Sequence, residues 1–488
     1  MRKKTTLPAA GPALRPRGLK ALSPLLLAAL LASCAAVGPE YRAPDVVSPA
    51  AWHSGMDGGL GSGEMNPDAS AQWWHQFGDP TLSELIEKAI LASPDLRSAQ
   101  ASLREARARR AIAGAAFFPT VGASLSGRRN SPATSAAGKE LYSAGFDASW
   151  EPDVFGGIRR SAEAAQADME RSEATLATTR ISLLAELALN YVEFRALQAR
   201  LAIARSNLES QSETLQLTDW RAQAGLVGSL EMEQAQANLE QTRAQIPLLE
   251  TNLAEAQNRL SILVGDVPGS LGVQLARPAS IPGMPHVMAV GIPADTLRRR
   301  PDVRAAERRL AAETARVGQA QAARYPSISL SGSIGLDSLT LDSLGSGTAR
   351  RSFIASIAAT LFDAGRLKQQ VIAQDAVREQ AMLAYESTVL TALEDVENAL
   401  VAFARSKERQ AALIAAAQAA RNAAQLARQR YSSGVIDFQT VLDTERSVLN
   451  IEDSLAVAEA DGASSVIRLY KALGGGWEPV PTSAASDK

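Results

Sequence analysis

The residues that commonly carry out chemistry are few in this chain, and their spacing does not suit catalysis. Its three histidines, His53, His75 and His286, all fall in irregular segments, and none has the spacing of a zinc site. The run Gly345-Ser346-Gly347-Thr348 lacks the lysine of a phosphate-binding loop. No G-x-S-x-G turn of a serine hydrolase is present. The sequence therefore predicts no metal, no cofactor and no enzymatic activity.

The single cysteine, Cys34, stands where a lipid-attachment site is expected. Basic residues near the N-terminus are followed by the apolar segment 22–31, and small residues then lead into Cys34. This pattern predicts a lipoprotein signal peptide at 1–33, with an N-acyl group and S-diacylglycerol on Cys34 as the new N-terminus. The alternative is a chance cysteine near an ordinary cleavage site. Ala35 follows rather than Asp, which in bacterial lipoproteins permits export to the outer membrane.

The composition favours long helices packed by small residues. The chain has 488 residues, of which 46% are hydrophobic but only 5% aromatic, and its formal net charge is −2. Without a basic excess, nothing indicates a nucleic-acid partner. The mean hydropathy of −0.07 is too polar for a helical membrane protein. The apolar run 21–32 is shorter than the roughly 20 residues of a spanning helix.

The chain is built from two tandem repeats. Pro94-Asp95-Leu96-Arg97 recurs as Pro301-Asp302-Val303-Arg304, and Phe118-Pro119 recurs as Tyr325-Pro326, both about 207 residues later. A second stretch recurs with a constant offset of about 209 residues and includes Gly225 and Gly434. The predicted organisation is a tail and equatorial segment at 34–80, repeat 1 at 81–265, a linker at 266–292, repeat 2 at 293–474, and a C-terminal tail at 475–488.

Each repeat contains two segments with the alternation of a β-strand, at about 119–152 in repeat 1 and about 326–363 in repeat 2. Segment 142–151 places Tyr142, Phe146 and Trp150 on one face and polar residues on the other. Alternation of this length is typical of transmembrane strands, although a half-buried sheet in a soluble protein shows it too. Aromatic residues at both ends of the segments favour the membrane, because they resemble interfacial girdles.

Four strands are too few to close a membrane barrel, which needs at least about eight. Unpaired strand edges in lipid would leave backbone groups unsatisfied, at several kcal/mol each. The barrel must therefore be shared between chains. Two chains would give eight strands and three would give twelve, and the strand count alone is compatible with both.

Two very long helices follow the strand segments, within the predicted helical stretches 157–265 and 364–474. No proline interrupts 158–222 or 366–431, and about 60 residues make roughly 90 Å of helix. An apolar stripe from Val389 to Phe403 recurs at steps of three and four, with an Ala-rich second face. This pattern suits helices that have neighbours on both sides in the wall of a cylinder.

Two glycine turns interrupt the long helices at the points farthest from the strands. Each turn starts with a glycine suited to a left-handed helix end and then places apolar residues at the tip. Ordinary hairpin capping explains this pattern, but exposed apolar tips more often indicate docking to a partner. The candidate docking residues are Gly225, Leu226, Val227, Gly434, Val435 and Ile436.

Four stretches together resemble the outer membrane factor family of TolC-like trimeric channels, in particular the lipoprotein, NodT-type members of drug-efflux systems. They are 34–41, which begins at Cys34, 73–82, 292–303 and 434–446. The resemblance implies a mainly helical chain, three copies of which form a 12-stranded barrel and a 12-helix periplasmic tunnel. The termini and the linker would form an equatorial belt. It also implies docking to a periplasmic adaptor that links to an inner-membrane pump.

The resemblance further implies that side chains near the second tip close the tunnel. By motif, the acidic ring falls on Asp443, with Arg446 as its basic neighbour, and Tyr431 matches a tyrosine whose hydrogen bonds help to hold the closed state. Gln439 stands where relatives carry an apolar residue, which puts an apolar constriction in doubt. A carboxylate repeated around a narrow pore would repel anions and attract cations. Alternatively, Asp443 and Arg446 form an i,i+3 surface pair.

The predicted function is a passive exit duct for drugs or other small molecules, in the outer membrane of a Gram-negative bacterium, within a tripartite, RND-type efflux system. The duct of a type I protein-secretion system is a close alternative. A lipid-anchored periplasmic coiled-coil spacer without a pore is a rival of a different class, and it predicts no membrane strands.

Overall fold

The computed structural model describes residues 36–45, 48–55, 57, 59–61, 63, 70–130, 139–285 and 288–477. Several residues named above therefore lie outside the described residues: Cys34, His286, the signal segment, most of one strand-connecting loop and the end of the C-terminal tail. The chain divides into two compact units. The first contains Arg109–Gln166 and Ala311–Glu379 with the described residues up to Arg42, and the second contains Ala43–Ala108, Ala167–Leu310 and the described residues from Gln380 onward.

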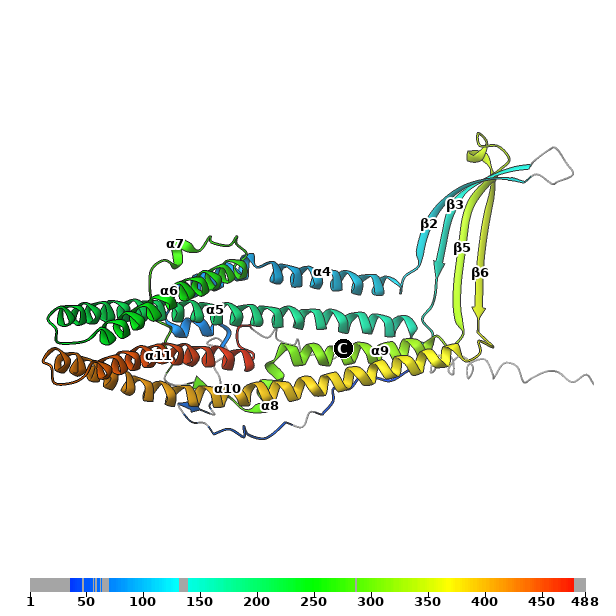
Figure 1. Cartoon of the computed structure of the whole chain (residues 1–488). Helices are drawn as coiled ribbons and strands as arrows, with labels where there is room; N and C mark the ends of the chain where they lie inside the picture. The colour runs from blue at the N-terminus through cyan, green and yellow to red at the C-terminus, as the bar shows by residue number, and fades with distance from the viewer. Residues whose placement is uncertain are drawn as a thin grey trace, which may run out of the picture. The chain divides into compact units, whose positions relative to one another are not determined.

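The first unit carries a four-stranded antiparallel sheet in the order β2-β3-β5-β6 (Figure 1). Its strands are β2 (Thr120–Asn130), β3 (Lys139–Trp150), β5 (Ser327–Ser338) and β6 (Thr348–Ala358). The two hairpins, one from each repeat, are joined through β3 and β5. The outermost strands, β2 and β6, are the edges of this sheet.

The two faces of the sheet differ in the way that the alternation predicts. Residues directly opposite each other in antiparallel strands share a face, and Val121 lies opposite Ala148, as Leu336 lies opposite Ala349. The apolar face is exposed, with Leu125 at 70%. On the other face, the Ser124 hydroxyl donates to Asp147 Oδ2 at 2.8 Å. One face is therefore apolar and open, while the other has its own polar contacts.

Aromatic side chains gather where the sheet meets the helices of the first unit. Phe155 and Tyr325 stack with their ring centroids 5.0 Å apart. Trp150 Nε1 donates to the carbonyl of Phe117 at 3.0 Å. Phe362 is exposed. These positions are those of the predicted helix-proximal girdle.

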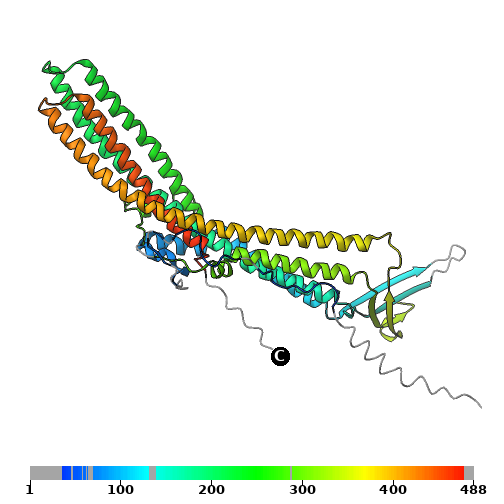
Figure 2. The same ribbon diagram turned by 90° about the horizontal axis from the view of Figure 1, so that it is seen from below.

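The lengths of the helices repeat from one half of the chain to the other (Figure 2). Helices α4 (Pro94–Ala115) and α9 (Pro301–Ala322) each have 22 residues, α5 (Gly157–Gln223) and α10 (Arg366–Ser432) each have 67, and α6 (Ser229–Leu263) and α11 (Phe438–Ala472) each have 35. The predicted order of helix, strand, strand, long helix and long helix is confirmed in both repeats. Among the helices of the described residues, none is both long enough and apolar enough for a bilayer crossing.

The core of the second unit joins the long helices to irregular segments. Trp73 in the short helix η1 (Trp73–Phe77) stacks on Tyr470 of α11, with ring centroids 5.7 Å apart. Phe403, in the predicted stripe of α10, is fully buried in the same core. The shorter elements around it are β1 (Leu60–Gly61), which pairs in parallel with β4 (Met288–Ala289), and the helices α3 (Pro80–Ala92), α7 (Gly272–Leu275) and α8 (Pro293–Arg299).

Candidate functional site

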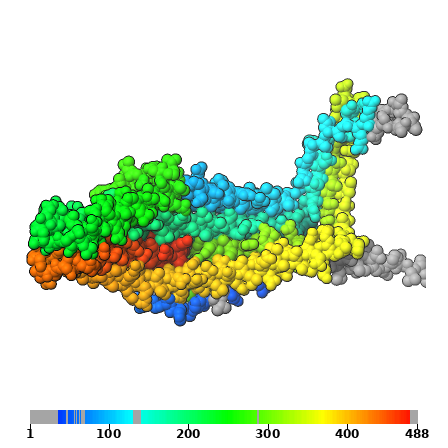
Figure 3. All heavy atoms as spheres, in the orientation of Figure 1, coloured from blue at the N-terminus to red at the C-terminus, as the bar shows by residue number. Residues whose placement is uncertain are grey.

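The two turns of the second unit share one backbone geometry. Gly225 and Gly434 have φ angles of 72° and 73°. The amide after each glycine donates to a carbonyl five residues back, Leu226 to Arg221 at 2.8 Å and Val435 to Arg430 at 2.9 Å. This is the Schellman ending, which needs a left-handed residue and thus favours glycine. The two turns lie side by side (Figures 1 and 3).

Apolar side chains at these turns are exposed. Leu226 is 68% exposed and Val435 is 69% exposed. Val227 and Ile436 are half-buried, and Ile436 packs against the local core. Trp220, on the last turn of α5, is also exposed, at 59%. Trp220 was not predicted from the sequence, although an aromatic residue one turn before a glycine turn could have indicated it.

Arg221 ties the first turn to the second. Its Nη1 donates to the carbonyl of Tyr431, and its guanidinium carbon lies 4.3 Å from the centroid of the Tyr431 ring. Tyr431 is only 2% exposed and also contacts Phe438, at 5.4 Å between centroids. Its buried hydroxyl has no hydrogen-bond partner within the described part of the chain. The predicted role of that hydroxyl in holding a closed state therefore stays a prediction.

Apart from Tyr431, which lies near the end of α10, the predicted aperture residues lie near the start of α11. Gln439 and Asp443 are both exposed, and Gln439 Nε2 donates to Asp443 Oδ1 at 2.9 Å. The Arg446 side chain extends toward α6, where its Nε donates to Asn238 Oδ1 at 3.0 Å. Asp443 is thus held by its own helix, while Arg446 joins two helices. A carboxylate that stays exposed can face a pore, as the ring hypothesis requires, and this hypothesis stays a prediction.

A buried polar contact lies close to the aperture residues. Glu445 is 4% exposed, and Thr214 of α5 donates to its Oε1 at 2.6 Å. Burial raises the pKa of Glu445, although Thr214 and Arg428 counteract this effect. Glu445 was not predicted from the sequence. An acidic residue in line with the apolar positions Val441 and Leu442 was the available signal.

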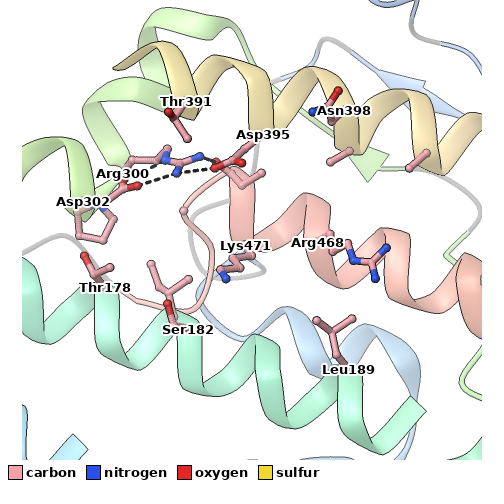
Figure 4. Close-up of a pocket in the computed structure, with 16 residues that line it drawn as sticks. Thr178, Ser182, Leu189, Arg300, Asp302, Thr391, Asp395, Asn398, Arg468 and Lys471 are labelled. Carbon is pink, nitrogen blue, oxygen red and sulfur yellow. Dashed lines mark hydrogen bonds and ion pairs between the residues drawn. The ribbon is translucent and has the colours of Figure 1, made fainter. Parts of the chain in front are cut away.

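Arg300 fastens three helices together beside a pocket of about 690 Å³ (Figure 4). Its Nη2 donates to Asp302 Oδ2 at 2.6 Å and to Asp395 Oδ2 of α10 at 2.9 Å. Its Nη1 donates to the last carbonyl of α11, that of Ala472, at 3.1 Å. Lys471, also on α11, lines the pocket. No group of three or more potential metal ligands occurs among the residues that the structure describes.

Comparison with known proteins decides the family. The sequence profile of the outer membrane efflux protein family matches residues 85–266 and 292–475. The chain belongs to this family. The matched segments correspond to the two repeats, with the linker between them.

Relatives of this outer membrane efflux protein match over almost its whole length. It is 33% identical to the pyoverdine export outer membrane protein OpmQ of Pseudomonas putida over 468 residues, which are 94% of this chain and 97% of the relative. It is 31% identical to nodulation protein T of Rhizobium leguminosarum over 456 residues, 92% and 96% of the two chains. The solved outer-membrane channel OprN superposes with a TM-score of 0.84 at 38% identity, covering 91% of this chain and 100% of that one.

These likenesses confirm the predicted family, fold class and outer-membrane location, and they make the chain a subunit of an outer-membrane efflux channel. Its relatives are channel and efflux proteins.

Proposed function

We propose that three copies of this chain form a passive duct through which an efflux system releases small molecules across the outer membrane. The observation that carries the proposal is the four-stranded sheet, with one exposed apolar face and with β2 and β6 as its edges. Three such sheets joined edge to edge close a 12-stranded barrel. The apolar faces then meet lipid, and the polar faces line the pore. The strand count allows two chains or three, and the resemblance to TolC-like channels favours three.

Native mass spectrometry of the purified protein tests the assembly. We expect a complex of three chains that migrates as an oligomer on an unheated gel and as a single chain after heating. A monomer with no change on heating would refute the barrel and favour a spacer without a pore. A complex of two chains would refute the trimer alone.

Conductance in planar bilayers tests the position of the gate. We expect a small conductance from the wild type and a large increase from Asp443→Ala combined with Arg446→Ala. This double variant removes both the carboxylate ring and the hydrogen bond from Arg446 to Asn238 of α6. Arg405→Ala combined with Glu408→Ala is a matched control, since this i,i+3 pair on α10 is exposed. Equal conductance in all three proteins would place the gate elsewhere, for example at Gln439 or Tyr431.

We also propose that Cys34 carries a lipid that sits at the helix-proximal end of the barrel. Residues shortly after it are held within the first unit by hydrogen bonds: the Val37 amide donates to the Phe155 carbonyl at 3.1 Å, and Arg160 Nε donates to the Val37 carbonyl at 3.2 Å. The Gly38 backbone lies against Gly318 so closely that a Cβ would be 2.3 Å from the Gly318 Cα. Phe155 follows β3 by a few residues, so the chain is held near the membrane interface. The intact mass of the mature protein should include the acyl groups, and Cys34→Ser should lack them.

The exposed apolar tips are the proposed docking surface for a periplasmic adaptor, which would connect the duct to an RND-type inner-membrane pump. Leu226→Glu with Val435→Glu should lower dye efflux from cells while leaving the conductance of the purified channel unchanged. Val273→Glu serves as a control, because Val273 is an exposed apolar residue away from the turns. Normal efflux in the tip variant would refute docking at this surface.

A further inference from the structure

Two pairs of adjacent arginines lie in the sheet of the first unit, Arg128-Arg129 on β2 and Arg350-Arg351 on β6. Successive residues of a strand point to opposite faces. Each pair therefore places one guanidinium on the polar face and one on the apolar face. The two pairs occupy different positions in the two repeats, because β2 is the first strand of its hairpin and β6 is the second strand of its own.

The register shows which arginine is on which face. Arg350 lies opposite Gly335, in line with Asp337 on the polar face, and its Nη1 is 3.9 Å from Asp337 Oδ2. Arg351 lies opposite Ile334 and two residues before Phe353, so it is on the apolar face. In the same way, Arg129 follows Leu125 and Gly127 on the apolar face of β2, and Arg128 takes the polar face.

Both apolar-face arginines lie just beyond an aromatic position, at the end of the sheet away from the helices. Arg129 is two residues beyond Gly127, which is paired with Tyr142. Arg351 is two residues from Phe353, which is 77% exposed. Aromatic rings of membrane strands lie at the boundary between hydrocarbon and headgroups. Arg129 and Arg351 are thus placed at the level of the lipid headgroups.

Among the residues that the structure describes, neither arginine has a partner that neutralises it strongly. Arg129 Nη1 is 3.6 Å from Glu140 Oε1, but both side chains are well exposed. The interaction free energy of such exposed ion pairs is small. Arg351 has no ion-pair partner among the described residues. A guanidinium matches a phosphate through two parallel hydrogen bonds, so it recognises phosphate better than a neutral headgroup.

We propose that Arg129 and Arg351 bind phosphate groups on lipid headgroups of the outer leaflet, around the mouth of the channel. This inference rests on the proposed membrane barrel, whose helices extend to the periplasmic side. It adds a lipid-binding function to the outer surface of the duct. The ligand is a phosphorylated lipid rather than free phosphate, because the apolar face beside each arginine accommodates acyl chains.

Binding of lipid A to the detergent-purified oligomer tests the proposal. Lipid A carries phosphate and acyl chains, and native mass spectrometry counts the molecules retained at each concentration. Arg129→Gln with Arg351→Gln should weaken this binding about 30-fold, because each arginine near an anionic surface contributes a factor of about five. Arg128→Gln with Arg350→Gln is the matched control, since each change is one residue away on the opposite face, and it should bind like the wild type. Arg129→Lys with Arg351→Lys should retain part of the affinity.

Three outcomes would overturn the proposal. The first is equal lipid A binding by the two glutamine variants, provided that both form oligomers with normal heat-modifiable migration. The second is loss of binding in the polar-face variant alone. The third is displacement of lipid A by an equal concentration of inorganic phosphate. Failure of the proposed barrel would look different, because the wild type itself would then form no heat-modifiable oligomer.

Discussion

The tie between Arg221 and Tyr431 should hold the second turn of the helices against the first. Arg221 donates to the Tyr431 carbonyl and covers its ring at 4.3 Å. A hydrogen bond from a charged group contributes about 1.5–3 kcal/mol, and a cation–π contact at a partly exposed site about 0.5–1 kcal/mol. Their sum is about 2–4 kcal/mol per chain. Removing the side chain should therefore favour separation of the turns by about 30-fold at the lower figure, since 1.4 kcal/mol is a factor of ten.

Single-channel recording measures this change directly. Arg221→Ala should raise the open probability of the channel, and Arg221→Lys should lie between the variant and the wild type because it keeps the charge but loses the planar fork. Arg243→Ala is a suitable control, since Arg243 forms an exposed i,i+3 pair with Glu240 on α6. An unchanged open probability in folded Arg221→Ala would refute the view that this contact stabilises the closed state.

Three further predictions concern stability. Burial raises the pKa of Glu445, so the folded state binds this proton more tightly than the unfolded state. The protein therefore loses stability as the pH rises from the pKa of Glu445 in the unfolded chain through the raised pKa in the folded chain. In Glu445→Gln, the melting temperature should depend less on pH over this range, and it should be higher than that of the wild type at neutral pH. Arg300→Ala removes a donor shared by two carboxylates and two carbonyls. Because both carboxylates are partly exposed, we expect a cost of about 1.5–3 kcal/mol, measured as a lower melting temperature. Gly265→Ala should also lower the melting temperature, because a Cβ there would lie 2.6 Å from the Ala92 carbonyl oxygen, and more than Gly225→Ala, where the space is open.

The fold was predictable because its signals are local and repeated. Alternation with a period of two fixes the strands and their faces, and a stretch without proline fixes the long helices. The duplication gave each signal twice, so the order of elements in one repeat supported the order in the other. Gly225 and Gly434 were identified for the same reason, since a left-handed helix end needs glycine wherever it occurs.

The contacts at the turns were not predictable in this way. Arg221 and Tyr431 are 210 residues apart in the chain, and Thr214 and Glu445 are 231 apart. Such pairs depend on which faces of four helices meet, and a periodic pattern identifies a buried face without identifying its partner. The hydrogen bond from Arg446 to Asn238 could not be predicted for the same reason. The local sequence is the same whether Arg446 pairs with Asp443 on its own helix or with a residue of another helix.

The two repeats keep the same backbone at their turns but differ in the chemistry they present. The second turn carries the aromatic ring of Tyr431 and the exposed carboxylate of Asp443, whereas the first supplies partners for the second, Arg221 and, on α6, Asn238. Identical turns would have no reason to move differently. These polar contacts all run from the first repeat to the second: Arg221 holds the end of α10, while Thr214 and Asn238 hold the first part of α11. Opening should therefore begin with the second turn moving away from the first, so a disulfide that joins the two turns within one chain should keep the channel closed even in the Asp443→Ala variant.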